Sequence, residues 1–501
     1  MSKTLRMRTG PEVYSPVAPL SSLSYIPLSF KLGLESLLQS LIYIYNPKPL
    51  PVEPKTAWQQ VTSEIQSQIN RHERYWWQRS GYALAILLQN AGYTQAAQIK
   101  ILRFFARRIA NSLGVASEPG AQRWKSFMTD DNNPIELSWD WHTGVERPTA
   151  RFSIEPIGLD AGTSGDPRNE QAAAAFKHSV LQALPDADMS WFDHFEAFFN
   201  EGTNRNSVEG HSSKVFWAFD LGEDNLTSKA YFFPGYRARA TNQTNLQVIS
   251  EAIASAPSCT LEKLGAFNKF VEFVHEHERK GRPPLELDML AIDMIDCSTS
   301  RLKIYFRNRQ TDFRSVSETM SLGGRVTGHD MDVGLDQLQS LWNSLFDREG
   351  ESEETPLGQA DHRTAGILYN VEFRLGGQAP KAKIYIPVRH YARTDAQVIM
   401  SVSKFMDSQG ESRKNKQLAR HAEAGARREQ DPAERHGPVS LVSAAYAKAF
   451  STIFTDDAIT NSRGLHTYIA CSVQTGGALR VVSYINPQEE KLRQPAPQQD
   501  L

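Results

Sequence analysis

The sequence has few cysteines, no surplus of charge of one sign and no long apolar run. The three cysteines, Cys259, Cys297 and Cys471, lie far apart, which excludes a disulfide-rich secreted scaffold and a CxxC metal or redox site. The 55 lysines and arginines are balanced by 57 aspartates and glutamates. Because no basic excess exists to neutralise a phosphate backbone, we do not expect the protein to bind nucleic acid.

Signals for export or membrane insertion are also missing. The basic residues that follow Met1 are not followed by the apolar segment of a secretory signal. The longest apolar stretch, residues 32–45, is short for a bilayer and is interrupted by Glu35 and Gln39. These absences predict a cytoplasmic protein with no membrane partner, and they leave a homodimer open.

Composition divides the chain into three parts. Residues 1–55 end in a proline-rich run, which predicts an N-terminal extension that is partly disordered. Residues 488–501 are polar and predict a disordered tail. Residues 56–487 are expected to form one domain. Within it, the charged stretch 409–436 is an insertion that fits either a solvated helix or a disordered segment.

Pairs of short β-type runs recur along the domain, with turn residues between the two members of each pair. Glycines mark three of these turns, at Gly222, at 376–377 and at 476–477. Segments of helical character, such as 242–277 and 333–346, separate the pairs. The five predicted pairs are 134–141 with 150–155, 215–220 with 228–234, 288–294 with 301–307, 367–374 with 381–387, and 466–473 with 478–485.

This repeat predicts the fold class. A unit of two helices and two strands, used five times, can close ten antiparallel strands into a barrel with the helices outside. Closure removes the exposed edges that such a sheet would otherwise have. We therefore expect an α+β barrel whose ligand site lies in the lumen.

One face of the predicted strands carries lysines and tyrosines. Side chains two residues apart share a face of a strand. The pairs that share a face in this way are Lys229 with Tyr231, Lys303 with Tyr305, and Lys383 with Tyr385. A single such strand is typical of a solvated surface. Recurrence at one place in the repeat favours a polar lumen, because the apolar faces of the strands pack against the outer helices.

A lumen lined with buried cations needs an anion, because unpaired buried charge is costly. The pattern favours pyrophosphate, since each charge-assisted hydrogen bond contributes roughly 1.5–3 kcal/mol and several together would hold it without a metal ion. When an allylic pyrophosphate ionises, it leaves a cation that water would destroy. Aromatic faces stabilise a desolvated cation by about 2 kcal/mol each and exclude water, which suits the tyrosines to that task.

Glu136 occupies the same face of the first predicted strand as Ser138 and Asp140. A glutamate on a strand is most often a surface residue. In a cationic lumen, however, its carboxylate could accept a hydrogen bond from an acceptor group such as an indole N–H. It could also help to remove the ring proton after alkylation.

Several motifs together resemble the fungal dimethylallyltryptophan synthase family of aromatic prenyltransferases. The resemblance extends from about Glu73 to Tyr484 and keeps the order and spacing of the motifs. The motifs that carry it are Pro-Ile-Glu-Leu-Ser-Trp at 134–139, Arg-Phe-Ser-Ile-Glu-Pro-Ile-Gly at 151–158, Lys-Ala-Tyr-Phe-Phe at 229–233, Arg-Leu-Lys-Ile-Tyr at 301–305, and Lys-Ile-Tyr-Ile-Pro at 383–387.

This resemblance implies the ABBA prenyltransferase barrel and metal-independent transfer of a dimethylallyl group in fungal secondary-metabolite (alkaloid) biosynthesis. Dimethylallyl pyrophosphate would be a co-substrate, with no cofactor. The resemblance implies catalytic roles for Glu136 and Lys229 and contacts of Glu136 and Ile135 with the aromatic acceptor. The residues expected to hold pyrophosphate are Arg151, Lys229, Arg301, Lys303 and Lys383. The tyrosines expected to shield the allyl cation are Tyr231, Tyr305, Tyr385, Tyr468 and Tyr484.

The acceptor and two other functions are left open. Glu136 favours an indole or tryptophan-derived acceptor, whereas a polyketide phenol, a xanthone or tyrosine is the alternative. A non-catalytic barrel that binds a phosphorylated or aromatic ligand is a further alternative. A metal-dependent enzyme is disfavoured because residues 130–134 and 456–460 lack the DDxxD spacing. Asp293 and Asp296 are expected to be turn residues, and no metal site is expected.

Overall fold

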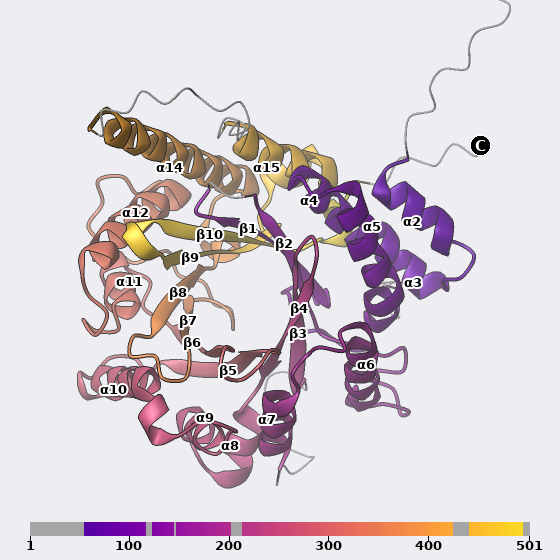
Figure 1. Ribbon diagram of the computed structural model, residues 1–501, viewed down its shortest axis with the longest axis horizontal. Coiled ribbons are helices and arrows are strands. Elements are labelled where there is room, and N and C mark those ends of the chain that lie inside the picture. Colours follow the sequence, from indigo (N-terminus) through magenta and orange to yellow (C-terminus); the bar gives the residue numbers. More distant parts are fainter. Residues whose placement is uncertain (1–54, 117–122, 145–146, 202–212, 424–439, 494–501) are drawn as a thin grey trace, which may run out of the picture. The chain divides into compact units, whose positions relative to one another are not determined.

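The computed structural model describes residues 55–116, 123–144, 147–201, 213–423 and 440–493, and ten antiparallel strands within them form a closed barrel (Figure 1). Neighbours around the barrel follow the chain order, and β1 pairs with β10 to close it. The five predicted strand pairs are all present, and their ends lie within two residues of the expected positions. The strands are β1 (Ile135–His142), β2 (Thr149–Ile154), β3 (Val215–Leu221), β4 (Leu226–Phe232), β5 (Glu286–Asp293), β6 (Leu302–Asn308), β7 (Ile367–Phe373), β8 (Lys381–Ile386), β9 (His466–Val473) and β10 (Leu479–Ile485).

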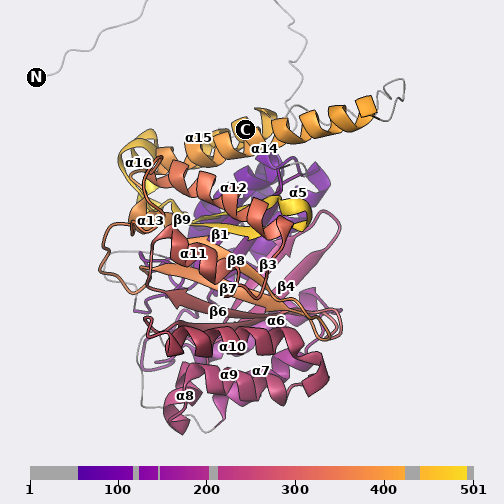
Figure 2. The same cartoon turned by 90° about the vertical axis from the view of Figure 1, so that its left-hand side faces the viewer.

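Helices precede each pair of strands and surround the barrel (Figures 1 and 2). Their sequences contain the expected start signals: α9, for example, begins at a capping box in which Thr244 and Gln247 bond each other's backbone N–H groups. The helices are α2 (Ala57–Ile65), α3 (Arg71–Trp76), α4 (Tyr82–Asn90), α5 (Gln95–Phe104), α6 (Glu170–Ala183), α7 (Ser190–Asn200), α8 (Gly235–Thr241), α9 (Asn245–Ala254), α10 (Gly265–Arg279), α11 (Phe313–Met320), α12 (His329–Phe346), α13 (Val388–Tyr391), α14 (Asp395–Glu423), α15 (Ser440–Ile453) and α16 (Asp456–Asn461).

The strands are buried on both faces, as β6 illustrates. Ile304 and Phe306 point into the core between barrel and helices, where Phe306 packs against Phe270 of α10 with ring centroids 5.4 Å apart. Lys303 and Tyr305 alternate with them and line the lumen. The barrel therefore has an apolar outer core, which fixes the register of the strands, and a polar and aromatic interior. This arrangement confirms the predicted fold class.

Two predicted segment boundaries change. The disordered tail predicted to begin at 488 is wrong for residues 488–493. There a short helical turn covers Glu489–Lys491, and the Arg493 guanidinium bonds the backbone of Phe454 and the carboxylate of Asp456. The 409–436 stretch continues α14 as far as Glu423, which favours the helix interpretation for that part. Residues 424–436 and the predicted N-terminal extension, apart from Lys55, lie outside the described residues.

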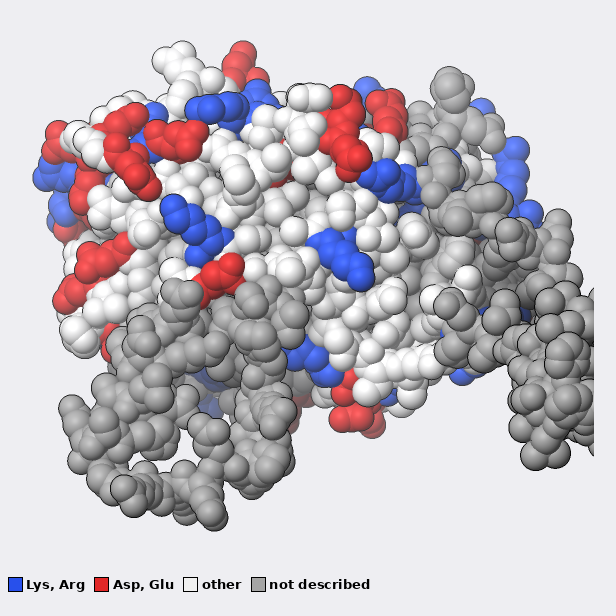
Figure 3. Space-filling view, turned by 90° about the horizontal axis from the view of Figure 1, so that it is seen from above, with Lys and Arg blue, Asp and Glu red and all other residues white. Residues whose placement is uncertain are grey.

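The surface and the helices agree with the absences noted in the sequence. Among the described residues, every helix is too short or too polar to cross a bilayer. In the described part of the face shown in Figure 3, basic and acidic side chains are interspersed. This mixture resembles the near-neutral composition of the whole chain.

Candidate active site

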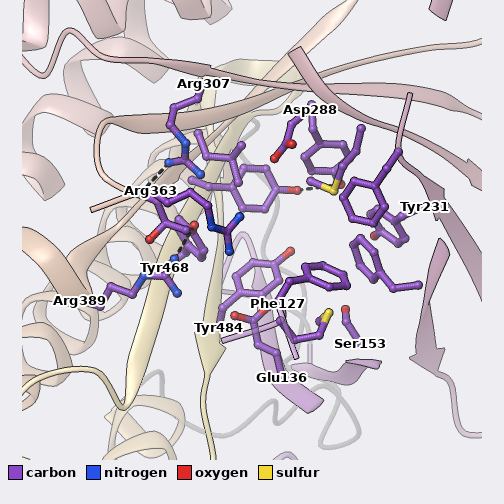
Figure 4. A pocket seen from close by; sticks show the side chains of 18 residues that line it. Phe127, Glu136, Ser153, Tyr231, Asp288, Arg307, Arg363, Arg389, Tyr468 and Tyr484 are labelled. Carbon is purple, nitrogen blue, oxygen red and sulfur yellow. Dashed lines mark hydrogen bonds between the residues drawn. The ribbon is translucent and has the colours of Figure 1, made fainter. Parts of the chain in front are cut away.

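The barrel lumen holds two chambers that share a layer of tyrosines. Along β6, Lys303 lies in the first chamber, Tyr305 contributes to both and Arg307 lies in the second. The first, here named the anion chamber, is lined by charged side chains from β2, β4, β6, β8 and β10. The second, the acceptor chamber, is lined mainly by aromatic and apolar side chains (Figure 4). The four tyrosines that line both are Tyr231, Tyr305, Tyr385 and Tyr484.

Cations in the anion chamber are held by carboxylates on neighbouring strands. Asp140 on β1 binds Arg151 at 2.5 Å and also binds Arg480. Asp220 on β3 binds Arg151 at 2.9 Å and also binds Lys229. The remaining contacts of this network are Lys303 Nζ to Asp293 at 2.5 Å, Arg301 Nε to Asp293 at 2.6 Å, and Arg301 Nη1 to Glu372 at 3.1 Å. This network of ion pairs fixes the positions of the cations before any ligand binds.

These carboxylates do not neutralise the chamber. The seven cations that line it are Arg151, Lys229, Arg301, Lys303, Lys381, Lys383 and Arg480, and the four carboxylates paired with them are Asp140, Asp220, Asp293 and Glu372. With every group ionised, three positive charges remain in excess. Among the described residues, no ion pair joins the ammonium of Lys383, which lies 4.9 Å from the ring centroid of Tyr385.

The surplus charge is reflected in the lysine pKa values. Burial, together with the nearby charge of Arg151, lowers the pKa of Lys383 to about 7. Burial lowers the pKa of Lys229 to about 8, although Asp220 opposes this shift. The carboxyl pKa of Asp140 moves down instead: burial opposes ionisation, but Arg151 and Arg480 outweigh it. A bound anion would therefore relieve an electrostatic cost that the free chamber carries.

The shared tyrosines form a continuous aromatic layer. The ring centroids of Tyr305 lie 5.7 Å from those of both Tyr231 and Tyr385, and Tyr484 lies 5.6 Å from Tyr385. The hydroxyls of Tyr305 and Tyr385 are 3.2 Å apart, and Asn370 donates to the Tyr385 hydroxyl at 3.0 Å. Burial raises the pKa of these phenols, so the layer presents neutral rings to both chambers.

Glu136 is buried in the acceptor chamber and is 8 % exposed. The hydroxyl of Thr467 on β9 donates a hydrogen bond to its Oε1 at 2.5 Å. Burial raises the pKa of Glu136 to about 7, while the Thr467 hydrogen bond and the charge of Arg389 oppose the rise. A carboxyl whose pKa lies near neutrality is suited to accept and release a proton.

The rest of the acceptor chamber is built from loops as well as strands. Glu155, at the end of β2, accepts hydrogen bonds from the indole N–H of Trp124 at 2.8 Å and from the backbone N–H of Phe127 at 3.2 Å. These bonds hold Phe127 against Phe216 and Phe233, with ring centroids 5.4 and 5.1 Å apart. The chamber thereby gains an aromatic wall that is suited to a planar ring.

Most of the residues predicted from the sequence come together in the lumen. The predicted pyrophosphate ligands all line the anion chamber. Tyr468 differs from the other predicted tyrosines because it lines the acceptor chamber alone, where Arg389 donates to its hydroxyl at 2.9 Å. Ile135 is a correction: its side chain is fully buried in the outer core, since it alternates with Glu136 and points toward the helices.

Two further expectations change. The sequence indicated only a ligand anion as partner of the luminal cations, but carboxylates on neighbouring strands already pair most of them. Asp293 is no ordinary turn residue, since its side chain is buried and binds Lys303 and Arg301. Asp296 does have a turn role, because it accepts a hydrogen bond from the backbone N–H of Ser298 at 2.8 Å. Asp293 is the last residue of β5 and lies on the lumen face of that strand.

Several charged or polar residues of the acceptor chamber were not predicted from the sequence, although one of them, Arg307, follows the period of β6 two residues after Tyr305. Two of them lie at irregularities of the sheet. On β5, Leu287 pairs with Phe306 and Met289 with Tyr305, so Asp288 is an extra residue in a β-bulge. On β9, His466 pairs with Ile485 and Ile469 pairs with Ser483, so β9 has one more residue than β10 between these two pairs. Thr467 lies within this irregularity. The missed set consists of Asp288, Arg307, Arg363, Arg389 and Thr467.

One group among the described residues has the composition of a metal site. Asp130, His362 and His390 bring one ligand atom each within 4.8 Å of one another. The guanidinium of Arg389 lies 3.1 Å from the Asp130 carboxylate, and the Thr364 hydroxyl lies 2.8 Å from a nitrogen of each histidine. A cation and a hydroxyl already occupy these ligand atoms, so the group is explained as a polar network at the acceptor chamber.

Comparison with known proteins agrees with this geometry. Residues 72–421 match the family model described as tryptophan dimethylallyltransferase. The 4-O-dimethylallyl-L-tyrosine synthase of Claviceps purpurea is 31 % identical over 423 residues, covering 83 % of this chain and 88 % of that protein. The 7-dimethylallyltryptophan synthase of Aspergillus fumigatus is 29 % identical, covering 82 % of this chain and 84 % of that protein.

Solved structures share the fold. AnaPT from Neosartorya fischeri superposes with a TM-score of 0.69 at 21 % identity, covering 86 % of this chain and 98 % of that one. NotF, solved in complex with brevianamide F and DMSPP, also gives 0.69 at 21 % identity, covering 87 % of this chain and 99 % of that one. The barrel is thus the ABBA prenyltransferase fold. On the match of its sequence and the layout of its lumen, the chain belongs to the tryptophan dimethylallyltransferase family of aromatic prenyltransferases.

Proposed function

We propose that the protein transfers a dimethylallyl group from dimethylallyl pyrophosphate to an indole-containing, tryptophan-derived acceptor, without a metal ion. The observation that supports this best is the tyrosine layer, because it joins a cationic chamber to an aromatic one within a single lumen. Such a layer would stand between the leaving group and the acceptor ring, where the reacting carbon must lie.

The anion chamber would bind the pyrophosphate of the donor. Its three surplus positive charges, counted above, match a trianionic group. Lys383, which has no ion-pair partner among the described residues, and Lys229 would donate hydrogen bonds to the phosphate oxygens. As the carbon–oxygen bond breaks, its electron pair leaves with the pyrophosphate. Lys229 would then stabilise the growing negative charge, which is the catalytic role that we assign to it.

The tyrosine layer would stabilise the allyl cation that this step produces. The faces of Tyr231, Tyr305 and Tyr385 are neutral and buried, so they offer π-electron density without competing as charged nucleophiles. The layer would also keep bulk water away from the cation until the acceptor ring captures it.

Glu136 would position and deprotonate the acceptor. Its ionised carboxylate can accept a hydrogen bond from an indole N–H, which makes the ring more electron-rich. A ring π-electron pair then forms the new bond to the allyl carbon, and the proton lost from the ring passes to a base. Glu136, with a pKa of about 7, is the group in the chamber best matched to that task.

A phenol is the second candidate acceptor. The relative at 31 % identity is named as a tyrosine O-dimethylallyl synthase, and a phenolic O–H could donate to Glu136 as an indole N–H would. In that case the same carboxylate would take the proton of the hydroxyl, and the new bond would form at oxygen or at a ring carbon.

The test is an incubation of the purified protein with dimethylallyl pyrophosphate and a panel of indoles and phenols in excess EDTA, analysed by mass spectrometry. A product heavier by one isoprenyl unit supports the proposal and identifies the class of acceptor. Activity that EDTA abolishes and Mg²⁺ restores would contradict the metal-independent step. Saturable pyrophosphate binding with no product across the panel would favour a non-catalytic role.

A further inference from the structure

Asp288 is a half-buried carboxylate of the acceptor chamber that the proposed reaction does not use. It lies at the β-bulge of β5, and the bulge explains its direction. Leu287 points into the outer core and Met289 into the lumen. In a regular strand, these residues would share a face and Asp288 would point the other way. The bulge therefore turns both Asp288 and Met289 toward the acceptor chamber.

Asp288 has no partner of its own within the described chain. No hydrogen bond or ion pair joins its carboxylate to another described residue. This contrasts with Asp140, Asp220 and Asp293, each of which binds two cations in the anion chamber. Burial raises the pKa of Asp288, and the charges of Arg307 and Arg363 oppose the rise. A carboxylate that is partly withdrawn from water and unpaired gains free energy when a ligand satisfies it.

Arg363 provides an opposite charge beside Asp288. Arg307 is already committed, since its guanidinium donates to the carbonyl of Thr364 at 2.8 Å. Arg363 is an exposed residue on the loop before β7, and its guanidinium makes no hydrogen bond or ion pair to any described residue where it lines the chamber. Figure 4 shows Asp288 and Glu136 on opposite sides of the chamber, with the Arg363 side chain at a level between them. The strand order agrees, because β5 and β1 lie on different sides of the barrel, four places apart.

We propose that Asp288 binds an amino group of the acceptor and that Arg363 binds its carboxylate, so that the acceptor is a free aromatic amino acid. Its ring would extend from these two charges toward Glu136 and the tyrosine layer. Neutral aromatic compounds would leave both charges unsatisfied and would bind more weakly. This inference rests on the proposed function and specifies its acceptor.

The amino group is tested with acceptor pairs that differ in that group alone. The pairs are L-tryptophan with indole-3-propionate, and L-tyrosine with 3-(4-hydroxyphenyl)propanoate. Their affinities for pyrophosphate-saturated protein are measured by calorimetry, and turnover is measured with dimethylallyl pyrophosphate. For the wild type, we expect the preferred amino acid to bind at least about tenfold more tightly than its deaminated partner. Asp288→Asn should abolish that preference by weakening only the amino acid.

Glu286→Gln is the matched control. Glu286 lies two residues before Asp288 on β5, but it is exposed and binds Arg309 at 2.8 Å outside the chamber. This variant should keep the wild-type preference. Asp288→Asn should also keep the wild-type affinity for pyrophosphate, which reports an intact barrel. Equal losses on both members of a pair, or a wild type that does not distinguish them, would overturn the assignment of Asp288.

The carboxylate is tested with tryptophan and tryptamine. Arg363→Gln should weaken tryptophan binding by about tenfold and leave tryptamine binding unchanged; equal effects on both would overturn the role of Arg363.

Prenyl transfer and the recognition of a free amino acid can fail separately. Selective binding of the amino acid without any product would contradict the prenyl transfer but support this inference. Product formation with no discrimination by charge would contradict this inference alone.

Discussion

Two carboxylates on one strand show how differently the two chambers treat charge. Glu136 and Asp140 lie four residues apart on β1, on the same face, and both are buried. The pKa of Glu136 is raised to about 7, whereas that of Asp140 is lowered. Burial opposes ionisation at both positions. The difference comes from Arg151 and Arg480, which bind Asp140 directly, while Glu136 receives only a hydroxyl hydrogen bond from Thr467.

Carboxyl groups have a structural role in the anion chamber and a chemical role in the acceptor chamber. In the anion chamber each carboxylate is a fixed counter-charge that holds cations in place for a ligand. In the acceptor chamber Glu136 makes no ion pair to a described residue, so its proton can be exchanged near neutral pH. The same functional group, a carboxyl, thus serves on one strand to position cations at one end of the lumen and to move protons at the other.

The largest expected effect follows from removal of the exchangeable carboxyl. Glu136→Ala should lower turnover by about 10²–10⁴, the usual range for loss of a general acid–base group. Donor affinity should stay unchanged, because Glu136 lies outside the anion chamber. Steady-state kinetics and calorimetry with pyrophosphate measure the two quantities. Near-normal turnover in this variant would reject the role of Glu136.

The two carboxylates should also differ in their effect on stability, with opposite signs. Asp140→Asn leaves Arg151 and Arg480 without a buried partner and should lower the free energy of unfolding by about 3 kcal/mol. Glu136→Gln should raise it at pH 8 by on the order of 2 kcal/mol. Burial raises the folded-state pKa of Glu136 to about 7, above its unfolded value. Stability is therefore lost as pH rises from the unfolded pKa to about 7, and the loss is complete at pH 8. Urea unfolding at pH 8 measures both changes, and equal signs would contradict this interpretation.

The anion chamber could be predicted from the sequence because it follows the period of the strands. Lys303 with Tyr305 and Lys383 with Tyr385 alternate with apolar residues, and alternation alone assigns a face. The same alternation of polar and apolar residues, together with the turn glycines, predicted the five strand pairs. Asp220 and Glu372 are also on that face, but a lone carboxylate on a strand carries no sequence signal that distinguishes an internal counter-charge from a surface group.

The acceptor chamber could be predicted only in part, because much of it departs from that period. Asp288 reaches the lumen through a bulge, and a bulge depends on hydrogen-bond register that the sequence does not state. Arg363 and Phe127 lie on loops between elements, so their positions depend on contacts distant in the chain, such as the bonds from Glu155 to the 124–127 segment. Strand periodicity therefore predicts the donor half of the site better than the acceptor half.

A smaller effect is expected from the one lysine of the anion chamber that has no described ion-pair partner and lies next to the tyrosines. Lys383→Met should weaken pyrophosphate binding by about tenfold, the value of one charge-assisted hydrogen bond. Because no carboxylate loses a partner, stability should not fall, in contrast to Asp140→Asn. Lys100→Met, on the outer helix α5, is the matched control and should bind pyrophosphate normally. Unchanged affinity in the Lys383 variant would remove it from the donor site.

The smallest effects are expected from a change of pH. As pH rises, donor affinity in the anion chamber should fall and turnover, which depends on the acceptor chamber, should increase. In the free protein the pKa values of Lys383 and Lys229 are about 7 and about 8. A bound anion raises both, so binding takes up protons at pH 8 and donor affinity falls as pH rises above 7. Turnover at saturating donor should instead rise with pH through about 7 as Glu136 ionises. Calorimetry in buffers of different ionisation enthalpy should record uptake of about one proton at pH 8, reduced in Lys383→Met and unchanged in Glu136→Gln. The Glu136→Gln variant should lose the rise of turnover with pH but keep the fall of donor affinity. If this substitution changed both pH dependences, the two chambers would have to be treated as one coupled site.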